Sequence, residues 1–291
     1  KKHSNFYSDL KSSIEKINED GYVDLTGLIS TEMVDQINEK ISLPMSQPHS
    51  NGQRGYIGCG CQRYLADTMS YGKEVIDVYT NEFLIKLAET YAQDKIHLSN
   101  YRIYSTYPSE DFKMWWHLDN KIDTYDFENK VFVQTVVPDD KGIIFIMYLS
   151  DVEDGGVQVV KGSHKWSSGY EREDFDHMEK EFSDDVVTFN NCPKGTFIAY
   201  DYALIHRAKP YNGGKVRTSL FGQLSPSRMP TGEPILLNSR DLLDLNPKQQ
   251  QVLNFGKEAT TLNWPIGSID EFSEPTQDKK NILSKLKNFF A

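Results

Sequence analysis

Short segments rich in Val, Ile, Phe, Tyr and Thr follow one another through the middle of the chain, and Gly, Pro, Asn or Asp bound each of them. Such segments are typical of β-strands. Because no helical pattern separates most of them, we expect antiparallel sheets of a sandwich or jelly roll rather than a parallel α/β sheet. The expected strands cover residues 96–107, 131–137, 143–150, 156–160, 185–190, 195–200, 203–208 and 215–224.

Helical patterns flank this region. Apolar residues recur at helical spacing before Gly21, then from Thr31 to a helix end before Pro44, and again over 73–92. Surface helices are expected at 247–255 and 279–290. We therefore expect one mainly β domain with flanking helices: a helical part at 1–95, a jelly-roll core at 96–225 and a C-terminal extension at 226–291.

The net charge of the chain disfavours some classes of binding partner. The 291 residues include 32 Lys and Arg against 42 Asp and Glu, a formal net charge of −10. This charge disfavours a nucleic acid or an anionic membrane as the main partner. No apolar stretch approaches the length of a membrane span, about 20 residues, and three cysteines are too few for a disulfide scaffold. We expect a cytoplasmic monomer or homodimer that acts on a small-molecule substrate.

Two histidines have neighbours that suggest a metal site. His117 and Asp119 are two residues apart, so an extended chain points both side chains to the same side. Alone, the motif also fits a hydrogen-bonded surface pair. His206 ends an apolar and aromatic segment late in the β region, where a buried histidine with a satisfied hydrogen bond is the simpler interpretation. Two histidines and one carboxylate are the set that holds non-haem Fe(II) and leaves open positions.

Arg217 is an unusual charge for a strand. It follows His206 by eleven residues, and the turn sequence Pro210–Gly214 lies between them. A partly buried arginine requires a carboxylate, either from the protein or from a ligand. A dicarboxylate co-substrate beside the histidines would satisfy it.

These features resemble the phytanoyl-CoA dioxygenase family of Fe(II)- and 2-oxoglutarate-dependent oxygenases. His117 and Asp119 match the family's His-x-Asp pair, His206 its distal histidine, and Arg217 the arginine eleven residues later. Residues 148–165, with Asp154-Gly155-Gly156 and an ending Gly162-Ser163-His164-Lys165, look like a long family segment. The resemblance covers about residues 5–225. Gln158 and Lys161 depart from it, standing where the family usually has Leu and Pro.

The resemblance implies a double-stranded β-helix, or cupin-like jelly roll, and it also implies roles for residues. His117, Asp119 and His206 would be catalytic metal ligands for Fe(II). Arg217 would bind the far carboxylate of 2-oxoglutarate, with help from Ser219 and with Asn100 or Tyr104 at the near end. Gln158, Trp116 and Arg54 are candidates for substrate contact. With O₂, the expected reaction hydroxylates a small polar metabolite and yields succinate and CO₂.

Two other classes of function fit part of the pattern. One is a non-catalytic jelly-roll module that keeps the metal, and the other is a zinc-dependent hydrolase that uses the same two histidines and aspartate. A hydrolase needs no arginine at the position of Arg217, whereas a 2-oxoglutarate enzyme does. The sequence leaves the substrate and the oxidised carbon open.

Overall fold

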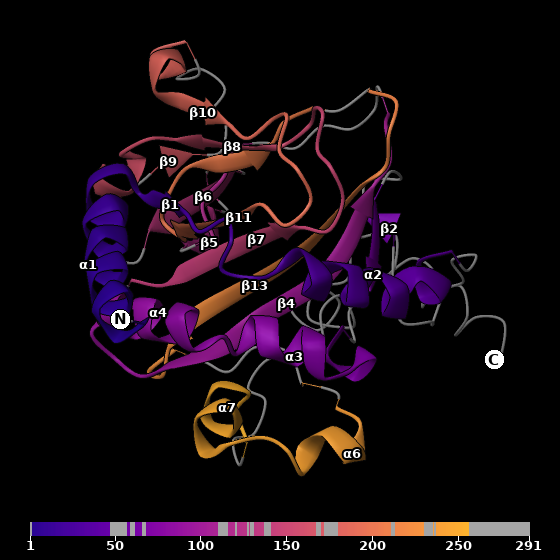
Figure 1. Ribbon diagram of the computed structural model, residues 1–291. Helices are drawn as coiled ribbons and strands as arrows, with labels where there is room; N and C mark the ends of the chain where they lie inside the picture. The colour runs from indigo at the N-terminus through magenta and orange to yellow at the C-terminus, as the bar shows by residue number, and fades with distance from the viewer. Residues whose placement is uncertain are drawn as a thin grey trace, which may run out of the picture.

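In the part of the chain that the structure describes, three antiparallel sheets form the framework (Figure 1). The computed structural model describes residues 2–46, 57–58, 62–65, 68–109, 116–119, 121–126, 128, 131–136, 141–166, 170–171, 180–210, 213–229, 235 and 237–255. The large sheet has the strand order β1-β11-β7-β13-β4-β3-β2, and the smaller ones have the orders β10-β8-β12 and β5-β6-β9. Every pairing of neighbouring strands in these sheets is antiparallel.

Each of the eight segments expected from the sequence overlaps one of the strands. Their bounds are β1 Tyr22–Asp24, β2 Ile57–Gly58, β3 Gln62–Leu65, β4 Ile96–Thr106, β5 Lys121–Asp126, β6 Val131–Val136, β7 Ile143–Tyr148, β8 Val157–Val160, β9 Tyr170–Glu171, β10 Val186–Thr188, β11 Phe197–Asp201, β12 His206–Ala208 and β13 Arg217–Pro226. The sequence patterns missed β1, β2, β3, β5 and β9, and all of these except β5 are four residues long or shorter.

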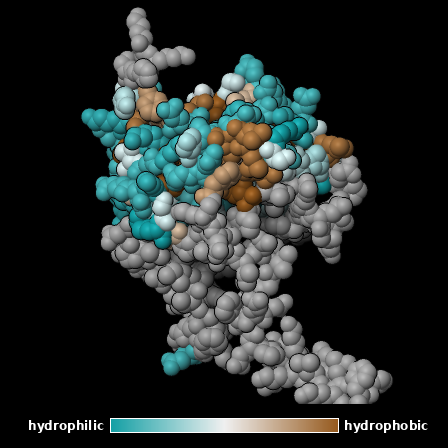
Figure 2. All heavy atoms as spheres, turned by 90° about the horizontal axis from the view of Figure 1, so that it is seen from below, coloured by the Kyte–Doolittle hydropathy of each residue, from teal (hydrophilic) through white to brown (hydrophobic). Residues whose placement is uncertain are grey.

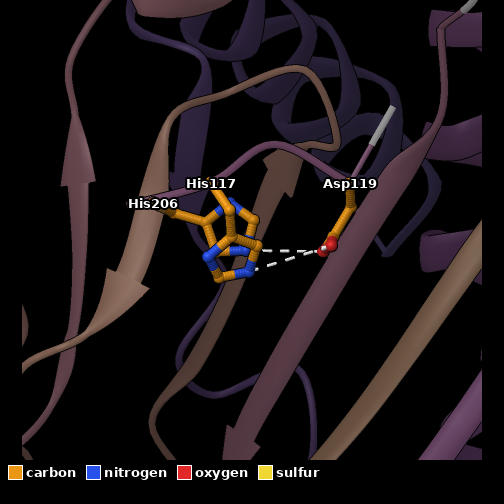
Figure 3. A group of neighbouring side chains, drawn as sticks. All are labelled: His117, Asp119 and His206. Atoms are coloured by element: carbon orange, nitrogen blue, oxygen red, sulfur yellow. Dashed lines mark ion pairs between the residues drawn. The ribbon is translucent and has the colours of Figure 1, made fainter. Parts of the chain in front are cut away.

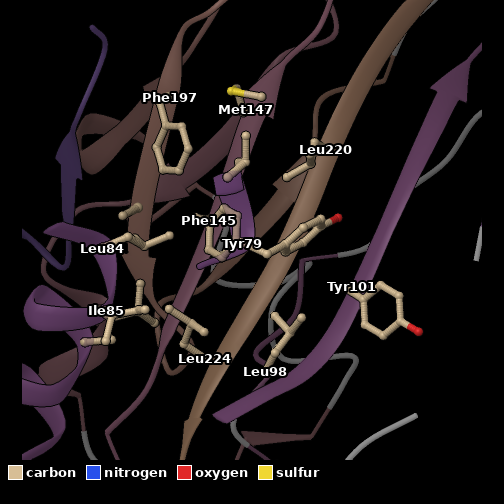
Figure 4. Close-up of a cluster of buried hydrophobic side chains, with 14 of the residues drawn as sticks. Tyr79, Leu84, Ile85, Leu98, Tyr101, Phe145, Met147, Phe197, Leu220 and Leu224 are labelled. Carbon is tan, nitrogen blue, oxygen red and sulfur yellow. The ribbon is translucent and has the colours of Figure 1, made fainter. Parts of the chain in front are cut away.

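Helices cover one face of the large sheet (Figure 1). The α-helices are α1 Lys2–Asp20, α2 Thr31–Ser46, α3 Lys73–Tyr79, α4 Glu82–Ala92, α6 Ser239–Leu242 and α7 Pro247–Val252, and the 3₁₀ turns are η1 Thr68–Tyr71, η2 Ser163–Lys165 and η3 Ser183–Asp185. Figure 4 shows Leu84 and Ile85 of α4 in one apolar cluster with Phe145 and Phe197 of the sheet. This packing excludes water from one side of the sheet.

The strands in the middle of the sheet have two buried faces. In β11, Phe197 and Ala199 belong to the cluster under the helices, whereas Ile198 and Tyr200 belong to a second cluster that includes Val157 and Val159 of β8. Successive side chains point to opposite faces, so the alternate residues of one strand serve two cores. The large sheet and the sheet β10-β8-β12 thus enclose a second interior. The predicted jelly roll with flanking helices is confirmed.

Two helix predictions were wrong in detail. The expected helix over 73–92 is divided into α3 and α4, because Asn81 begins a new helix and its side chain accepts the N–H of Phe83 and of Leu84. Helix α2 also continues past Pro44 to Ser46. A proline near the end of a helix removes one backbone donor without preventing a last turn. The expected helix at 279–290 lies outside the described residues.

Among the described residues, the face seen from below is mostly hydrophilic, with a hydrophobic area near its middle (Figure 2). Leu243, directly after α6, is 88% exposed. Single exposed apolar side chains are ordinary on folded domains. Within the described part of the chain, no helix combines the length and the apolar character required to cross a bilayer.

Candidate active site

The backbone brings His117 and His206 together across 89 positions of sequence. The N–H of each donates to the carbonyl of the other at 3.0 Å, which forms an isolated antiparallel bridge. The N–H of Asp119 donates to the carbonyl of Tyr202 at 2.9 Å. These bonds fix the segment that carries His117 and Asp119 against the turn that leads into β12.

The carboxylate of Asp119 faces both imidazoles (Figure 3). Its Oδ2 lies 3.4 Å from His206 Nε2, and its Oδ1 lies 3.9 Å from His117 Nε2. One donor atom from each residue lies within 4.8 Å of the others. Donors at about 2.1 Å from one ion and at right angles are about 3 Å apart. The three side chains therefore fit one metal ion after a small inward movement.

The neighbours of His206 and Asp119 favour the binding of a cation by these two residues. His206 Nδ1 lies 2.9 Å from the carbonyl of Leu204, which can only accept, so Nδ1 donates and Nε2 is the ring nitrogen that faces Asp119 and could bind a metal. Burial raises the pKa of the Asp119 carboxyl, but His206, His117 and Arg102 lower it more, and the pKa falls below its usual range. Asp119 is thus anionic at neutral pH.

Arg217 lines the same cavity and is 2% exposed. Its Nη2 donates to Thr106 Oγ1 at 3.2 Å, while its Nε has no hydrogen-bond partner among the described residues. None of the ion pairs found within the described ranges includes Arg217. A buried charge is costly unless it is paired. A carboxylate ligand in the cavity would provide that pair.

The other residues expected around the co-substrate lie on the strands beside Arg217. Ser219 is fully buried on the same face of β13, and its Oγ has no hydrogen-bond partner among the described residues. Tyr104, its partner across the strands, lines the cavity. Asn100 does not line it, and its Oδ1 accepts from Nη1 of Arg102 at 3.2 Å. The co-substrate roles of these three residues stay predictions.

The residues expected to contact substrate have different positions. Gln158 lies on β8, where it accepts from Nε of Arg207 at 2.8 Å and donates to Thr188 at 3.0 Å. The guanidinium of Arg207 lies 4.2 Å from the ring of Trp116, which is 1% exposed. Gln158 and Trp116 therefore support the segments beside the two histidines. Arg54 lies outside the described residues.

Sequence reasoning missed several residues of the cavity wall. Gln62 and Tyr64 come from the short strand β3, and Arg102 comes from β4. Tyr64 donates to Gln62 at 2.6 Å, and Gln62 donates to Thr106 at 3.2 Å, so this chain of bonds reaches the acceptor that Arg217 also uses. The alternation of Asn100, Arg102 and Tyr104 along one extended segment is the sequence signal that one face of β4 is polar.

Asp201 begins the turn that leads to His206, and its protonation should make the free energy of unfolding depend on pH. It is 4% exposed, accepts from Ala203 N at 2.6 Å and receives a hydrogen bond from Tyr91. Burial raises its pKa to about 6, above the unfolded value of about 3.9. The folded state thus binds the proton more tightly, and stability falls as pH rises from about 4 to about 6, by roughly 3 kcal/mol.

We expect Asp201→Asn to remove this fall, because the amide can keep the bond from Ala203 and has no charge to bury. Urea unfolding of both proteins at several pH values between 4 and 7 measures it. The difference in free energy of unfolding, variant minus wild type, should grow with pH and level off above pH 6. Parallel curves for the two proteins would contradict the prediction.

Comparison with known proteins agrees with this geometry. Residues 105–219 match the family model described as phytanoyl-CoA dioxygenase (PhyH). AviO1 from Streptomyces viridochromogenes Tue57 has a similar structure, with a TM-score of 0.56 and 16% identity over 77% of this chain and 98% of that one. SnoN, a non-heme alpha ketoglutarate dependent epimerase from nogalamycin biosynthesis, gives 0.56 and 18% over 76% and 84%. EvdMO1 gives 0.54 and 16% over 75% and 50%. No curated protein sequence matches the chain significantly.

The structural neighbours share the fold of this chain, and the segment that matches the family model contains the site residues. Residues 105–219 include His117, Asp119, His206 and Arg217. Through this segment the chain is similar to the phytanoyl-CoA dioxygenase (PhyH) family.

Proposed function

We propose that the protein hydroxylates a small polar metabolite, with Fe(II) held by His117, Asp119 and His206 and with 2-oxoglutarate as co-substrate. The observation that carries this proposal is the buried guanidinium of Arg217 in the same cavity as the three ligands. No ion pair among the described residues includes it, and a carboxylate ligand would supply its counter-charge.

The residues of the chain bind the co-substrate and orient the metal ligands. Arg217 pairs with the far carboxylate of 2-oxoglutarate, and the unpaired hydroxyl of Ser219 supports the same end. The Leu204 carbonyl keeps the His206 ring oriented. Fe(II) and 2-oxoglutarate supply the oxidation: one atom of O₂ enters a C–H bond of the substrate, the other enters succinate, and the 2-oxoglutarate carboxyl next to the ketone leaves as CO₂.

Arg217 also separates this proposal from the other two classes. A zinc hydrolase needs a metal-bound water and a substrate, and it has no use for a buried guanidinium that awaits a carboxylate. A metal-binding module without catalysis would bind Fe(II) but would not consume 2-oxoglutarate.

The test is an anaerobic titration with Fe(II) and 2-oxoglutarate, followed by exposure to air. We expect a visible charge-transfer band when both are present, no band with Zn(II) in place of Fe(II), and succinate release once oxygen enters. Pools of metabolites that stimulate succinate release then identify the substrate. Absence of both the band and succinate would refute the oxygenase proposal, and hydrolysis by the Zn(II) form would favour the hydrolase.

A further inference from the structure

Side chains of three neighbouring strands meet beside the guanidinium of Arg217. In the register of the large sheet, Thr106 at the end of β4 lies opposite Arg217 of β13 and also opposite Gln62 of β3. Residues directly opposite each other on neighbouring strands point to the same face of a sheet. All three are buried, with exposed fractions of 2% for Arg217 and Gln62 and 0% for Thr106. They form a row across three strands, and both ends of the row line the cavity.

Hydrogen bonds connect the members of this row. The Oγ1 atom of Thr106 accepts from Nη2 of Arg217 and from Nε2 of Gln62, both at 3.2 Å. A hydroxyl oxygen has two lone pairs, so these two bonds use its full capacity as an acceptor. The other end of the Gln62 amide is also bound, because its Oε1 accepts from the hydroxyl of Tyr64 at 2.6 Å. Gln62 and Thr106 are therefore held in one orientation, and the guanidinium is held with them.

The bond to Thr106 leaves the guanidinium of Arg217 able to bind a ligand. Thr106 uses one N–H of Nη2, whereas a guanidinium has five N–H donors in a rigid plane. The Nε atom of Arg217 has no hydrogen-bond partner among the described residues. A long side chain that is ordered before binding loses less conformational freedom when a ligand arrives. Thr106 thus fixes the plane of the guanidinium at one nitrogen, and other donors stay available for the two oxygens of a carboxylate.

We propose that Thr106 and Gln62 are positioning residues, which hold Arg217 in the orientation that binds the far carboxylate of 2-oxoglutarate. Gln62 acts through Thr106, and Tyr64 holds the amide of Gln62 in the orientation that donates to Thr106. This inference rests on the proposed function, because Arg217 must be the residue that binds the co-substrate. A row that only stabilised the fold would affect the free energy of unfolding without a selective effect on 2-oxoglutarate.

The experiment measures two affinities in each variant. The charge-transfer band of the anaerobic, Fe(II)-loaded protein gives the affinity for 2-oxoglutarate, and competition with Co(II) gives the affinity for metal. Thr106→Val removes the acceptor from a side chain of similar size, and we expect it to weaken 2-oxoglutarate about tenfold, as for the loss of a hydrogen bond to a charged group. Thr106→Ser restores the hydroxyl, so its affinity for 2-oxoglutarate should stay within about twofold of wild type, and metal affinity should do so in both variants.

Gln62 and a double variant test the order of the chain of hydrogen bonds. Gln62→Leu leaves the hydroxyl of Thr106 in place but removes the donor that orients it, so we expect a smaller loss of 2-oxoglutarate affinity, about threefold. Because Gln62 acts through Thr106, adding Gln62→Leu to Thr106→Val should weaken 2-oxoglutarate no further.

Thr218→Val is the matched control for Thr106→Val. Thr218 follows Arg217 on β13, so its side chain points to the opposite face of the sheet, where its Oγ1 lies 2.8 Å from Oγ of Ser105. This variant also loses a hydroxyl bond between β13 and β4, but we expect it to keep the wild-type affinity for 2-oxoglutarate. A loss as large as that in Thr106→Val would show that any disturbance near Arg217 weakens binding, and this would contradict a specific role for the row.

Other results would also overturn the inference. Wild-type affinity for 2-oxoglutarate in Thr106→Val and Gln62→Leu, beside a loss in Arg217→Gln, would exclude the row and leave the proposed function intact. Equal losses of metal and 2-oxoglutarate affinity in Thr106→Val would assign the row to the fold instead. Additive losses in the double variant would show that Gln62 does not act through Thr106. If the wild-type protein gives no band and releases no succinate, the proposed function itself fails and the inference fails with it.

Discussion

Replacing His206 with alanine should lower the affinity for Fe(II) by at least about 100-fold and abolish release of succinate. Loss of a supporting partner of a ligand already costs about 10- to 100-fold in metal affinity, and loss of the ligand itself should cost more. His206 is the most buried of the three, with its side chain 6% exposed, and its ring is oriented by the Leu204 carbonyl. Competition titrations with Co(II) under anaerobic conditions measure the affinity without turnover.

A second histidine provides the control for this variant. His164 lies on η2 and contacts the carbonyl of Asn18 at 3.2 Å, outside the metal cluster. We expect His164→Ala to keep the wild-type metal affinity even where its thermal stability falls. Metal affinity equal to wild type in a folded His206→Ala protein would refute the ligand assignment. Far-UV circular dichroism of the metal-free proteins shows whether both are folded.

Much of the fold can be predicted from the sequence because its strands follow local sequence patterns. Segments such as 143–150 and 195–200 are apolar, β-branched and bounded by turn residues, and β7 and β11 lie where they were expected. The residues of the motif can be identified from the sequence for a different reason. The spacing of His117 and Asp119, and the eleven-residue offset of Arg217, are properties of the chain itself and need no knowledge of tertiary contacts.

The rest of the cavity depends on contacts between distant segments. Nothing in the sequence around Tyr64 shows that its ring will stack beside Arg102, since β3 is four residues long and has little pattern. The contact of Gln158 with substrate stays a prediction, and backbone alternation cannot show that Arg207 lies within hydrogen-bond reach of Gln158. The helix expected over 73–92 is divided at Asn81, because the side chain of Asn81 caps a new helix there although the apolar pattern continues.

Arg217→Gln should weaken binding of 2-oxoglutarate by about 100-fold or more while leaving the affinity for Fe(II) unchanged. Truncating one partner of a buried, hydrogen-bonded charge pair costs about 2–5 kcal/mol, and 1.4 kcal/mol corresponds to a factor of ten. The Gln side chain is shorter and neutral, so it cannot pair with the far carboxylate. Titration of the charge-transfer band with 2-oxoglutarate measures the change.

The lysine variant and the two measured affinities together decide the role of Arg217. Arg217→Lys keeps a cation but loses the fork, so we expect a smaller loss, about tenfold. If Arg217 only stabilised the fold through Thr106, both variants would weaken Fe(II) and 2-oxoglutarate alike, or neither. A selective loss of 2-oxoglutarate affinity, graded from Lys to Gln, follows only if the guanidinium binds the co-substrate. Wild-type affinity for 2-oxoglutarate in Arg217→Gln would refute that assignment and leave the buried charge without an explanation.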